Sequence, residues 1–340
     1  MAIILLSTFS FALLPTVQAS YGRWSEPENA GPPINTASRE YAARLSQDML
    51  NMLFVSYNRP GGYGELDIWM STRPSIDDPW GTPTNLGPTI NTPYNDLFGC
   101  ESSNRLTLYF DSDRPGGYGD EDIYMSTRPS IDDPWGTPTN RGPTINTDSC
   151  DCQPVFSIDE LIMYFGSDRL GGYGELDIWM STRPSIDDPW GTPTNLGSHV
   201  NSPYEDGNPS ISPNGLTLYF DSERPGGYGG SDMWMSTRPS IYADWSESVN
   251  LGPTINTAYG EWTPWICSDR ITLYFDSDTP GGYGSDDLWM SKCTTVGGVW
   301  VPVDKFGLLA PYIGLASTVL VATVATAIYI KRVKRRKEKQ

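Results

Sequence analysis

Residues 106–119 read LTLYFDSDRPGGYG, and this stretch decides the fold. Apolar and polar side chains alternate in its first half, which predicts a β-strand, and the proline and glycines that follow predict a tight loop. The motif Gly-Gly-Tyr-Gly recurs every 55 residues, starting at Gly61, Gly116, Gly171, Gly226 and Gly281. Residues 61–87 and 171–197 are identical. The chain is therefore built from five copies of one structural unit.

Each unit carries the signals of four short strands. One strand pattern precedes the glycine motif, another follows it at residues 122–126, and polar loops rich in proline separate these from the flanking strands. The repeats show no helical periodicity, so the sequence predicts an all-β chain, a β-propeller of four-stranded blades. Recurring tryptophans are expected to pack between the blades as large apolar anchors. They are Trp24, Trp80, Trp135, Trp190, Trp245 and Trp300.

The number of blades follows from how the ring closes. Five glycine motifs favour five blades, but the tryptophan element occurs six times, and a six-bladed ring is the alternative. Either Trp24 or Trp300 could belong to the outer strand that completes the blade shared by the two ends. Closing the ring removes the exposed strand edges.

The run Leu-Tyr-Phe-Asp-Ser-Asp-Arg-Pro-Gly-Gly-Tyr-Gly-x-x-Asp-Ile-Tyr/Trp resembles the WD40-like repeat of TolB-type β-propellers. The resemblance covers residues 24–307. It implies the propeller fold and carries almost no information about function.

The two ends of the chain differ from the repeats. Residues 1–20 combine an apolar run with the small-residue site Val17-Gln18-Ala19, which predicts a secretory signal peptide. Residues 308–330 are uncharged and long enough to cross a bilayer as a helix, and the strongly basic residues 331–340 follow them. The sequence therefore predicts a single-pass protein of the cell membrane, with a propeller over residues 21–307 outside the cell and a basic tail inside.

The charge of the chain limits its partners. It has 23 basic and 41 acidic residues and a formal net charge of −18. Such acidity disfavours binding to nucleic acid and is compatible with cationic partners or divalent metal.

One acidic position recurs in every unit, five residues after an asparagine in the motif Ile/Val-Asn-Thr/Ser. If these residues begin the innermost strands, they stand near one mouth of the channel, where oxygen ligands would suit Ca²⁺. The alternative is that each carboxylate accepts hydrogen bonds from nearby backbone donors. The five residues are Glu40, Asp96, Asp151, Asp206 and Glu261.

The glycine motifs present a ring of tyrosines that we interpret as a ligand-binding surface, because exposed tyrosine beside carboxylates suits a sugar or a protein partner. The alternative is that each tyrosine covers its own turn. The tyrosines are Tyr63, Tyr118, Tyr173, Tyr228 and Tyr283. A second acidic column is predicted to brace the glycine turns. It consists of Asp67, Asp122, Asp177, Asp232 and Asp287.

The cysteines and the single histidine do not recur with the repeat. We interpret Cys100, Cys150, Cys152, Cys267 and Cys293 as incidental, with one disulfide as the alternative. Cys150 and Cys152 are too close in sequence for an ordinary bridge, and no second pair has zinc-site spacing. His199 has no evident nucleophilic partner, so the sequence marks out no catalytic residue.

Three classes of function remain. A cell-surface, non-catalytic module that binds an extracellular glycan or protein agrees best with chemistry that recurs in every unit. An extracellular hydrolase acting on glycans through channel carboxylates is the first alternative, since paired acids suffice for glycoside hydrolysis. A structural protein of the cell envelope is the second. An enzyme should show unique acids in one or two blades, whereas the acids of this chain recur.

Overall fold

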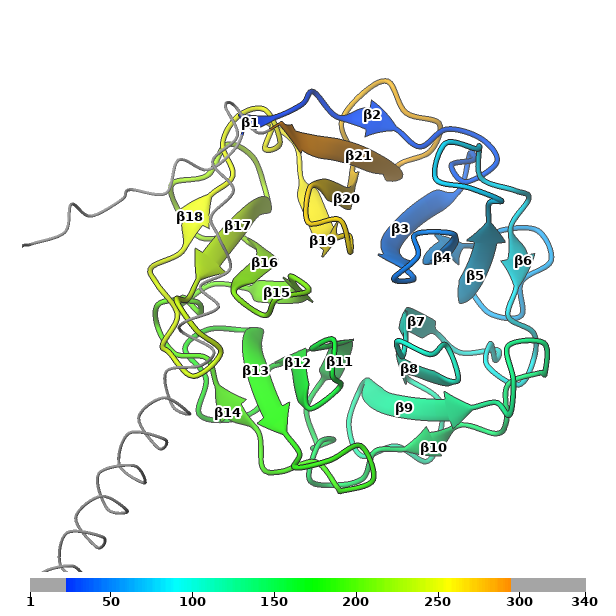
Figure 1. Cartoon of the computed structure of the whole chain (residues 1–340), viewed down its shortest axis with the longest axis horizontal. Helices are drawn as coiled ribbons and strands as arrows, with labels where there is room; N and C mark the ends of the chain where they lie inside the picture. The colour runs from blue at the N-terminus through cyan, green and yellow to red at the C-terminus, as the bar shows by residue number, and fades with distance from the viewer. Residues whose placement is uncertain (1–22, 295–340) are drawn as a thin grey trace, which may run out of the picture. The chain divides into compact units, whose positions relative to one another are not determined.

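The structure, a computed structural model, describes residues 23–294 and is a five-bladed β-propeller (Figure 1). This confirms the predicted all-β class and the preference for five blades. Within the described residues there is no helix, and so no helix that could cross a membrane. The predicted signal peptide, the predicted membrane helix, the basic tail and Trp300 lie outside the described range.

Each blade is an antiparallel sheet whose first strand lies closest to the axis (Figure 1). Blade 1 consists of β3 (Arg39–Leu45), β4 (Asn51–Tyr57), β5 (Leu66–Thr72) and β6 (Thr84–Asn85). Blade 2 consists of β7 (Asp96–Glu101), β8 (Thr107–Ser112), β9 (Asp122–Thr127) and β10 (Thr139–Asn140). Blade 3 consists of β11 (Asp151–Phe156), β12 (Ile162–Ser167), β13 (Asp177–Thr182) and β14 (Thr194–Asn195). Blade 4 consists of β15 (Asp206–Ile211), β16 (Thr217–Ser222), β17 (Asp232–Thr237) and β18 (Val249–Asn250).

Blade 5 joins the two ends of the described chain. Its strands β19 (Glu261–Ile266), β20 (Thr272–Ser277) and β21 (Asp287–Thr294) come from the last repeat, and β1 (Arg23–Trp24) and β2 (Glu28–Asn29) complete it. Asn29 pairs with Trp289 just as Asn85 pairs with Trp69 in blade 1. The N-terminal copy of the repeated element therefore closes the ring.

Every inner strand contains a bulge at the same position. The register of β11 against β12 shifts between Cys152 and Val155, and Gln153 within the bulge has a φ of 61°. Left-handed backbone is uncommon for residues other than glycine, so its recurrence in all five blades marks a shared structural requirement. The equivalent residues are Ala42, Phe98, Asn208 and Thr263, all with positive φ.

The apolar core is divided into clusters at the blade junctions. Between blades 1 and 2, for example, Leu53 and Ile68 pack with Phe110 and Trp135. The tryptophans of the outer loops belong to these clusters, as predicted, and an arginine of the same loop stacks on each of four rings. Arg128 lies 4.1 Å above the ring centroid of Trp135, which is cation–π distance.

The recurring asparagine of each unit fastens one repeat to the next. Asn91 accepts a hydrogen bond from Ile68 N and donates one to Ile68 O, each at 2.9 Å. The side-chain amide of Asn91 thus makes the two hydrogen bonds that a neighbouring strand would make, and it pairs the backbone N–H and C=O of Ile68 in β5. The same contacts recur at Asn35, Asn146, Asn201 and Asn256.

Candidate functional site

Two kinds of loop share one face of the ring. The glycine loops join the second strand of each blade to the third, and the inter-blade loops lead from an outer strand into the next inner strand. They meet at the blade junctions, since a Cβ on Gly64 would lie 2.7 Å from Thr92 O of the inter-blade loop.

The five tyrosines of the glycine loops point into solvent. Each is between 49% and 54% exposed, so about half of each side chain is accessible to a ligand: they are Tyr63, Tyr118, Tyr173, Tyr228 and Tyr283. The turn beneath each ring is braced as predicted. Asp122 accepts hydrogen bonds from Tyr118 N at 2.5 Å and Gly119 N at 3.4 Å. The other four aspartates of the column make the same contacts.

Sequence reasoning missed further exposed tyrosines on this face, three of which occupy equivalent positions in the repeat. Tyr94, Tyr204 and Tyr259 lie in inter-blade loops and are 43% to 45% exposed. Each lies two residues before one of the recurring acids. The pattern was not recognised as a repeat because Ser38 and Ser149 occupy this position in the other two units. We call the eight tyrosines together the tyrosine face.

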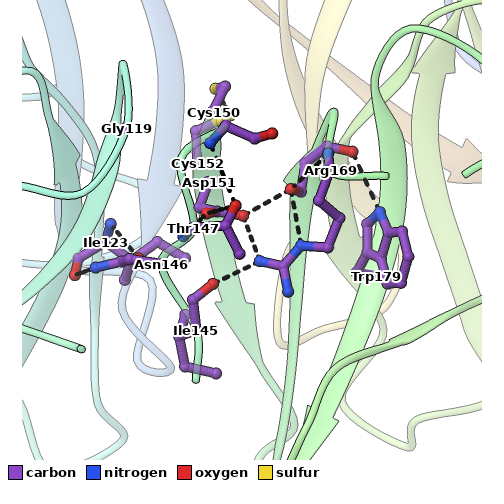
Figure 2. A network of polar contacts seen from close by, with 12 residues as sticks. Gly119, Ile123, Ile145, Asn146, Thr147, Cys150, Asp151, Cys152, Arg169 and Trp179 are labelled. Carbon is purple, nitrogen blue, oxygen red and sulfur yellow. Dashed lines mark hydrogen bonds and ion pairs between the residues drawn. The ribbon is translucent and has the colours of Figure 1, made fainter. Parts of the chain in front are cut away.

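The five recurring carboxylates lie in the first or second position of the inner strands, as predicted, but they are fully buried. Asp151 accepts hydrogen bonds from Thr147 N at 2.5 Å, Thr147 Oγ1 at 2.8 Å and Ser167 Oγ at 2.6 Å, and it pairs with Arg169 (Figure 2). A calcium ion would have to compete with these donors. The calcium hypothesis for Glu40, Asp96, Asp151, Asp206 and Glu261 stays a prediction.

One of the five carboxylates lacks the arginine partner that the others have. Arg59, Arg114, Arg169 and Arg224 reach Glu40, Asp96, Asp151 and Asp206 respectively. In blade 5 the equivalent residue is Thr279, whose Oγ1 lies 3.2 Å from Thr257 Oγ1. Burial raises the pKa of Glu261 to about 7, and no guanidinium offsets it.

A second set of buried carboxylates links neighbouring blades around the channel. Asp111 of β8 accepts a hydrogen bond from Gln153 N at 2.9 Å, and Asp221 of β16 accepts one from Thr263 N at 3.0 Å. Asp276 of β20 accepts one from Ala42 N at 3.3 Å. In each case the donor is the left-handed residue of the next inner strand, so the bulge directs its amide towards the preceding blade. We call these contacts latches.

The remaining two junctions are built differently. Val55 stands at the latch position of blade 1, and Tyr41 packs edge-on against Phe98 there, with ring centroids 6.1 Å apart. Gly166 stands at the latch position of blade 3, where the side chain of Gln153 supplies the acceptor instead.

The electrostatics of the channel are governed by burial. Burial raises the pKa of Asp221 to about 8 and that of Asp276 to about 6. Burial also lowers the pKa of Arg44, the only one of the five equivalent inner-strand residues that is charged. Its guanidinium lies 5.2 Å from the ring centroid of Trp265, and its Nε and Nη2 have no hydrogen-bond partner. The channel acids Asp111, Asp221 and Asp276 are thus buried and hydrogen-bonded to the next blade.

The cysteines are all free thiols in the structure, so the disulfide alternative is not found among the described residues. Cys150 Sγ lies 3.1 Å from Cys152 Sγ and 3.6 Å from Glu121 Oε2. Burial raises the pKa of Glu121, and Asp113 and Asp120 raise it further. Sequence reasoning missed this cluster, because Glu121 belongs to the preceding repeat.

His199 lies in a groove of about 800 Å³ between the outer parts of blades 3 and 4. Its Nδ1 is 2.7 Å from Trp245 O and its Nε2 is 3.2 Å from Glu247. The absence of a catalytic role for His199 stays a prediction.

Comparison with known proteins identifies the fold and no more. No family profile matches the chain, and no curated protein does. Similar solved structures include a glycoside hydrolase (TM-score 0.56, 9% identity, covering 84% of this chain and 95% of that one). A GH43_1 enzyme from Xanthomonas citri complexed with xylotriose has a TM-score of 0.51 and 12% identity, over 78% of this chain and 89% of that one. A putative TolB from Agrobacterium tumefaciens has a TM-score of 0.45 and 18% identity, over 76% and 85%. TolB propellers, which the repeat motif resembles, and propeller hydrolases are thus both among the structural neighbours.

Proposed function

We propose that the protein is a non-catalytic binding module and that the tyrosine face is its recognition surface. The observation that carries this proposal is the exposure of the five equivalent tyrosines, each on a turn fixed by an aspartate. Rigid aromatic side chains supply contact area at a low cost in conformational entropy. A ring of equivalent sites lets weak contacts add through effective concentration.

The repetition of the sites favours a repetitive ligand, and we propose an extracellular glycan. A sugar ring can stack on tyrosine while its hydroxyls bond to neighbouring polar groups. Asp113 and Asp168 lie on this face, where they accept backbone hydrogen bonds from Asn95 and Cys150. The alternative ligand is an extracellular protein, and the binding experiment below distinguishes it from a glycan.

The hydrolase alternative is less well supported. Its acids would have to reach substrate, yet Asp111, Asp221 and Asp276 are buried and already accept hydrogen bonds from the next blade. The fold itself does not discriminate, because the structural neighbours include both hydrolases and TolB proteins.

Substitution of the tyrosines tests the proposal. We expect Tyr118→Ala to weaken retention of the full-length protein on a glycan array only modestly, and replacement of all five glycine-loop tyrosines to abolish it. Tyr242→Ala is the matched control, because Tyr242 is 92% exposed in the loop between β17 and β18, at the other end of the blade. Binding that survives the fivefold replacement would contradict the proposal, and cleavage of a retained glycan would favour the hydrolase.

Display at the cell surface is also proposed, on the predicted signal, membrane helix and basic tail of the sequence. Protease added to intact cells should digest the propeller and spare the tail. Protection of the propeller would refute this orientation.

A further inference from the structure

Three potential metal ligands meet at the junction of blades 2 and 3, and each departs from the repeat. Glu121 directly precedes β9, Cys150 directly precedes β11, and Cys152 lies in β11. In place of Glu121 the other repeats have Leu66, Leu176, Ser231 and Asp286. In place of the two cysteines, blade 2 has Asn95 and Leu97.

The backbone brings these side chains together. Asp151 N donates a hydrogen bond to Glu121 O at 2.8 Å, and the equivalent bond recurs at three other junctions. The residues flanking this bond are therefore neighbours in every repeat that makes it. At the junction of blades 5 and 1 the same two positions hold an ion pair between Arg39 and Asp286. The two positions that hold an ion pair at the junction of blades 5 and 1 therefore hold a carboxylate and a thiol at the junction of blades 2 and 3.

The distances suit a tetrahedral metal ion. One ligand atom from each of Glu121, Cys150 and Cys152 lies within 4.8 Å of the other two. Zn–S bonds of about 2.3 Å and a Zn–O bond of about 2.1 Å place sulfur and oxygen roughly 3.6 Å apart and two sulfurs roughly 3.8 Å apart. The observed Cys150 Sγ to Glu121 Oε2 distance is 3.6 Å, and the sulfur pair, side by side in Figure 2, is 3.1 Å apart. Metal binding would therefore have to separate the two sulfurs by roughly 0.7 Å, which rotation of the half-buried Cys150 side chain would provide.

The surroundings favour a cation that can reach the site. Asp113 and Asp120 lie near Glu121, and Asp168 accepts a hydrogen bond from Cys150 N at 2.8 Å. Glu121 and Cys150 are half-buried, so the cluster is open to solvent on one side. Thiolate ligands select zinc-like ions over the hard cations that prefer an all-oxygen site.

We propose that Glu121, Cys150 and Cys152 bind one zinc-like divalent cation that joins blade 2 to blade 3. Three protein ligands leave the fourth tetrahedral position for water or another ligand. Binding releases the thiol protons to solvent, because the thiolate is the ligand form.

Titration of the reduced, metal-free full-length chain with Cd²⁺ and Zn²⁺ tests the site. We expect a cadmium–thiolate charge-transfer band that saturates at one Cd²⁺ per chain, its displacement by Zn²⁺, and a higher melting temperature with Zn²⁺ but not with Ca²⁺. Cys150→Asn and Glu121→Leu introduce residues that other repeats carry at these positions, so the fold should tolerate them. Each should weaken the metal affinity at least tenfold.

Cys293→Ser is the matched control, because Cys293 lies on β21 in another blade and should leave the affinity unchanged. Should Cys150→Asn fail to fold, the metal affinity of Cys150→Ser is compared with that of the parent through the same cadmium–thiolate band. The proposal is overturned if the parent shows no stoichiometric band, or if the variants bind as tightly as the parent. A Cys150–Cys152 disulfide that persists under reductant, seen as a mass two hydrogens lower, would overturn it as well.

Discussion

The side-chain oxygen of Gln153 accepts the hydrogen bond of Asn208 N at 2.7 Å, in the place that an aspartate takes at other blade junctions. Gly166 makes room for this exchange, since a Cβ there would lie 2.6 Å from Gln153 Oε1. Gln153 therefore takes part in contacts at two blade junctions. Its backbone N–H donates to Asp111 in a latch, and its side chain accepts the hydrogen bond of Asn208 N at the next junction.

Gln153→Ala should lower the free energy of unfolding by about 1–3 kcal/mol, because it leaves a buried amide of Asn208 without an acceptor. Urea denaturation measures this change. Gly166→Asp should be destabilising in the parent, where it collides with Gln153. It should be stabilising in a Gln153→Thr background, which reproduces the arrangement of Asp276 and Thr263 in blade 5, where Thr263 Oγ1 donates a hydrogen bond to Asp276. Equal effects in both backgrounds would contradict the latch.

The stability of the propeller should fall as the pH rises from about 4 to about 8. Burial raises the pKa of Asp221 to about 8, with Asp276 and Glu205 adding to the effect. The folded state then holds a proton that the unfolded chain has lost, so folding is favoured below the folded pKa and weakened as pH passes through it. Asp221→Asn should flatten the melting-temperature profile, while the exposed control Asp187→Asn should not. An unchanged profile in Asp221→Asn would refute the assignment.

Thr279→Arg should stabilise blade 5 above about pH 7 by giving Glu261 the guanidinium that the other recurring acids possess. The reverse change, Arg224→Thr, should cost about 3–5 kcal/mol, because it strands the buried carboxylate of Asp206. Thermal melting across pH compares the two variants. If Thr279→Arg lowers the melting temperature at high pH, the arginine does not act as the counter-ion.

Gly229→Ala should destabilise the junction of blades 4 and 5 by about 1–3 kcal/mol, as overpacking does. A Cβ there would lie 2.7 Å from Thr257 O, whereas one on the adjacent Gly230 would meet nothing within 4 Å. Gly230→Ala is therefore the control and should change stability by less than about 0.5 kcal/mol. Calorimetry gives the melting temperatures of both variants. Equal values would mean that the close approach of Gly229 to Thr257 O is not required for stability.

The fold was predictable because local signals repeat five times. The alternation around Leu108 and the turn at Gly116 indicate strand and loop, and the period assigns them to blades. The closing strand was harder to assign, since Trp24 and Trp300 carry the same element. The pairing of Trp24 with Cys293 and of Asn29 with Trp289 assigns the N-terminal copy to blade 5.

The candidate sites were predictable only where the chemistry recurs within a repeat. The ring containing Tyr118 was found in this way, whereas Tyr94 was missed because two repeats have serine at its position. The latches join residues of successive repeats, such as Asp111 and Gln153. They could not be predicted, because they depend on a left-handed backbone at a position that a different residue type occupies in every repeat. The Glu121 cluster was missed for a similar reason, because its members are brought together by a backbone bond between blades.

Closure of the ring by β1 and β2 sets an order of events during synthesis. The segment that completes blade 5 is made first, but its partner β21 ends at Thr294, the last residue that the structure describes. Until then the first strands of the nascent chain have no sheet to join, and blade 5 stays open. The pairing of β1 and β2 with β21 thus joins the first-synthesised and the last-synthesised segments of the propeller. Any factor that holds residues 23–29 as the chain emerges would therefore control when the propeller becomes complete.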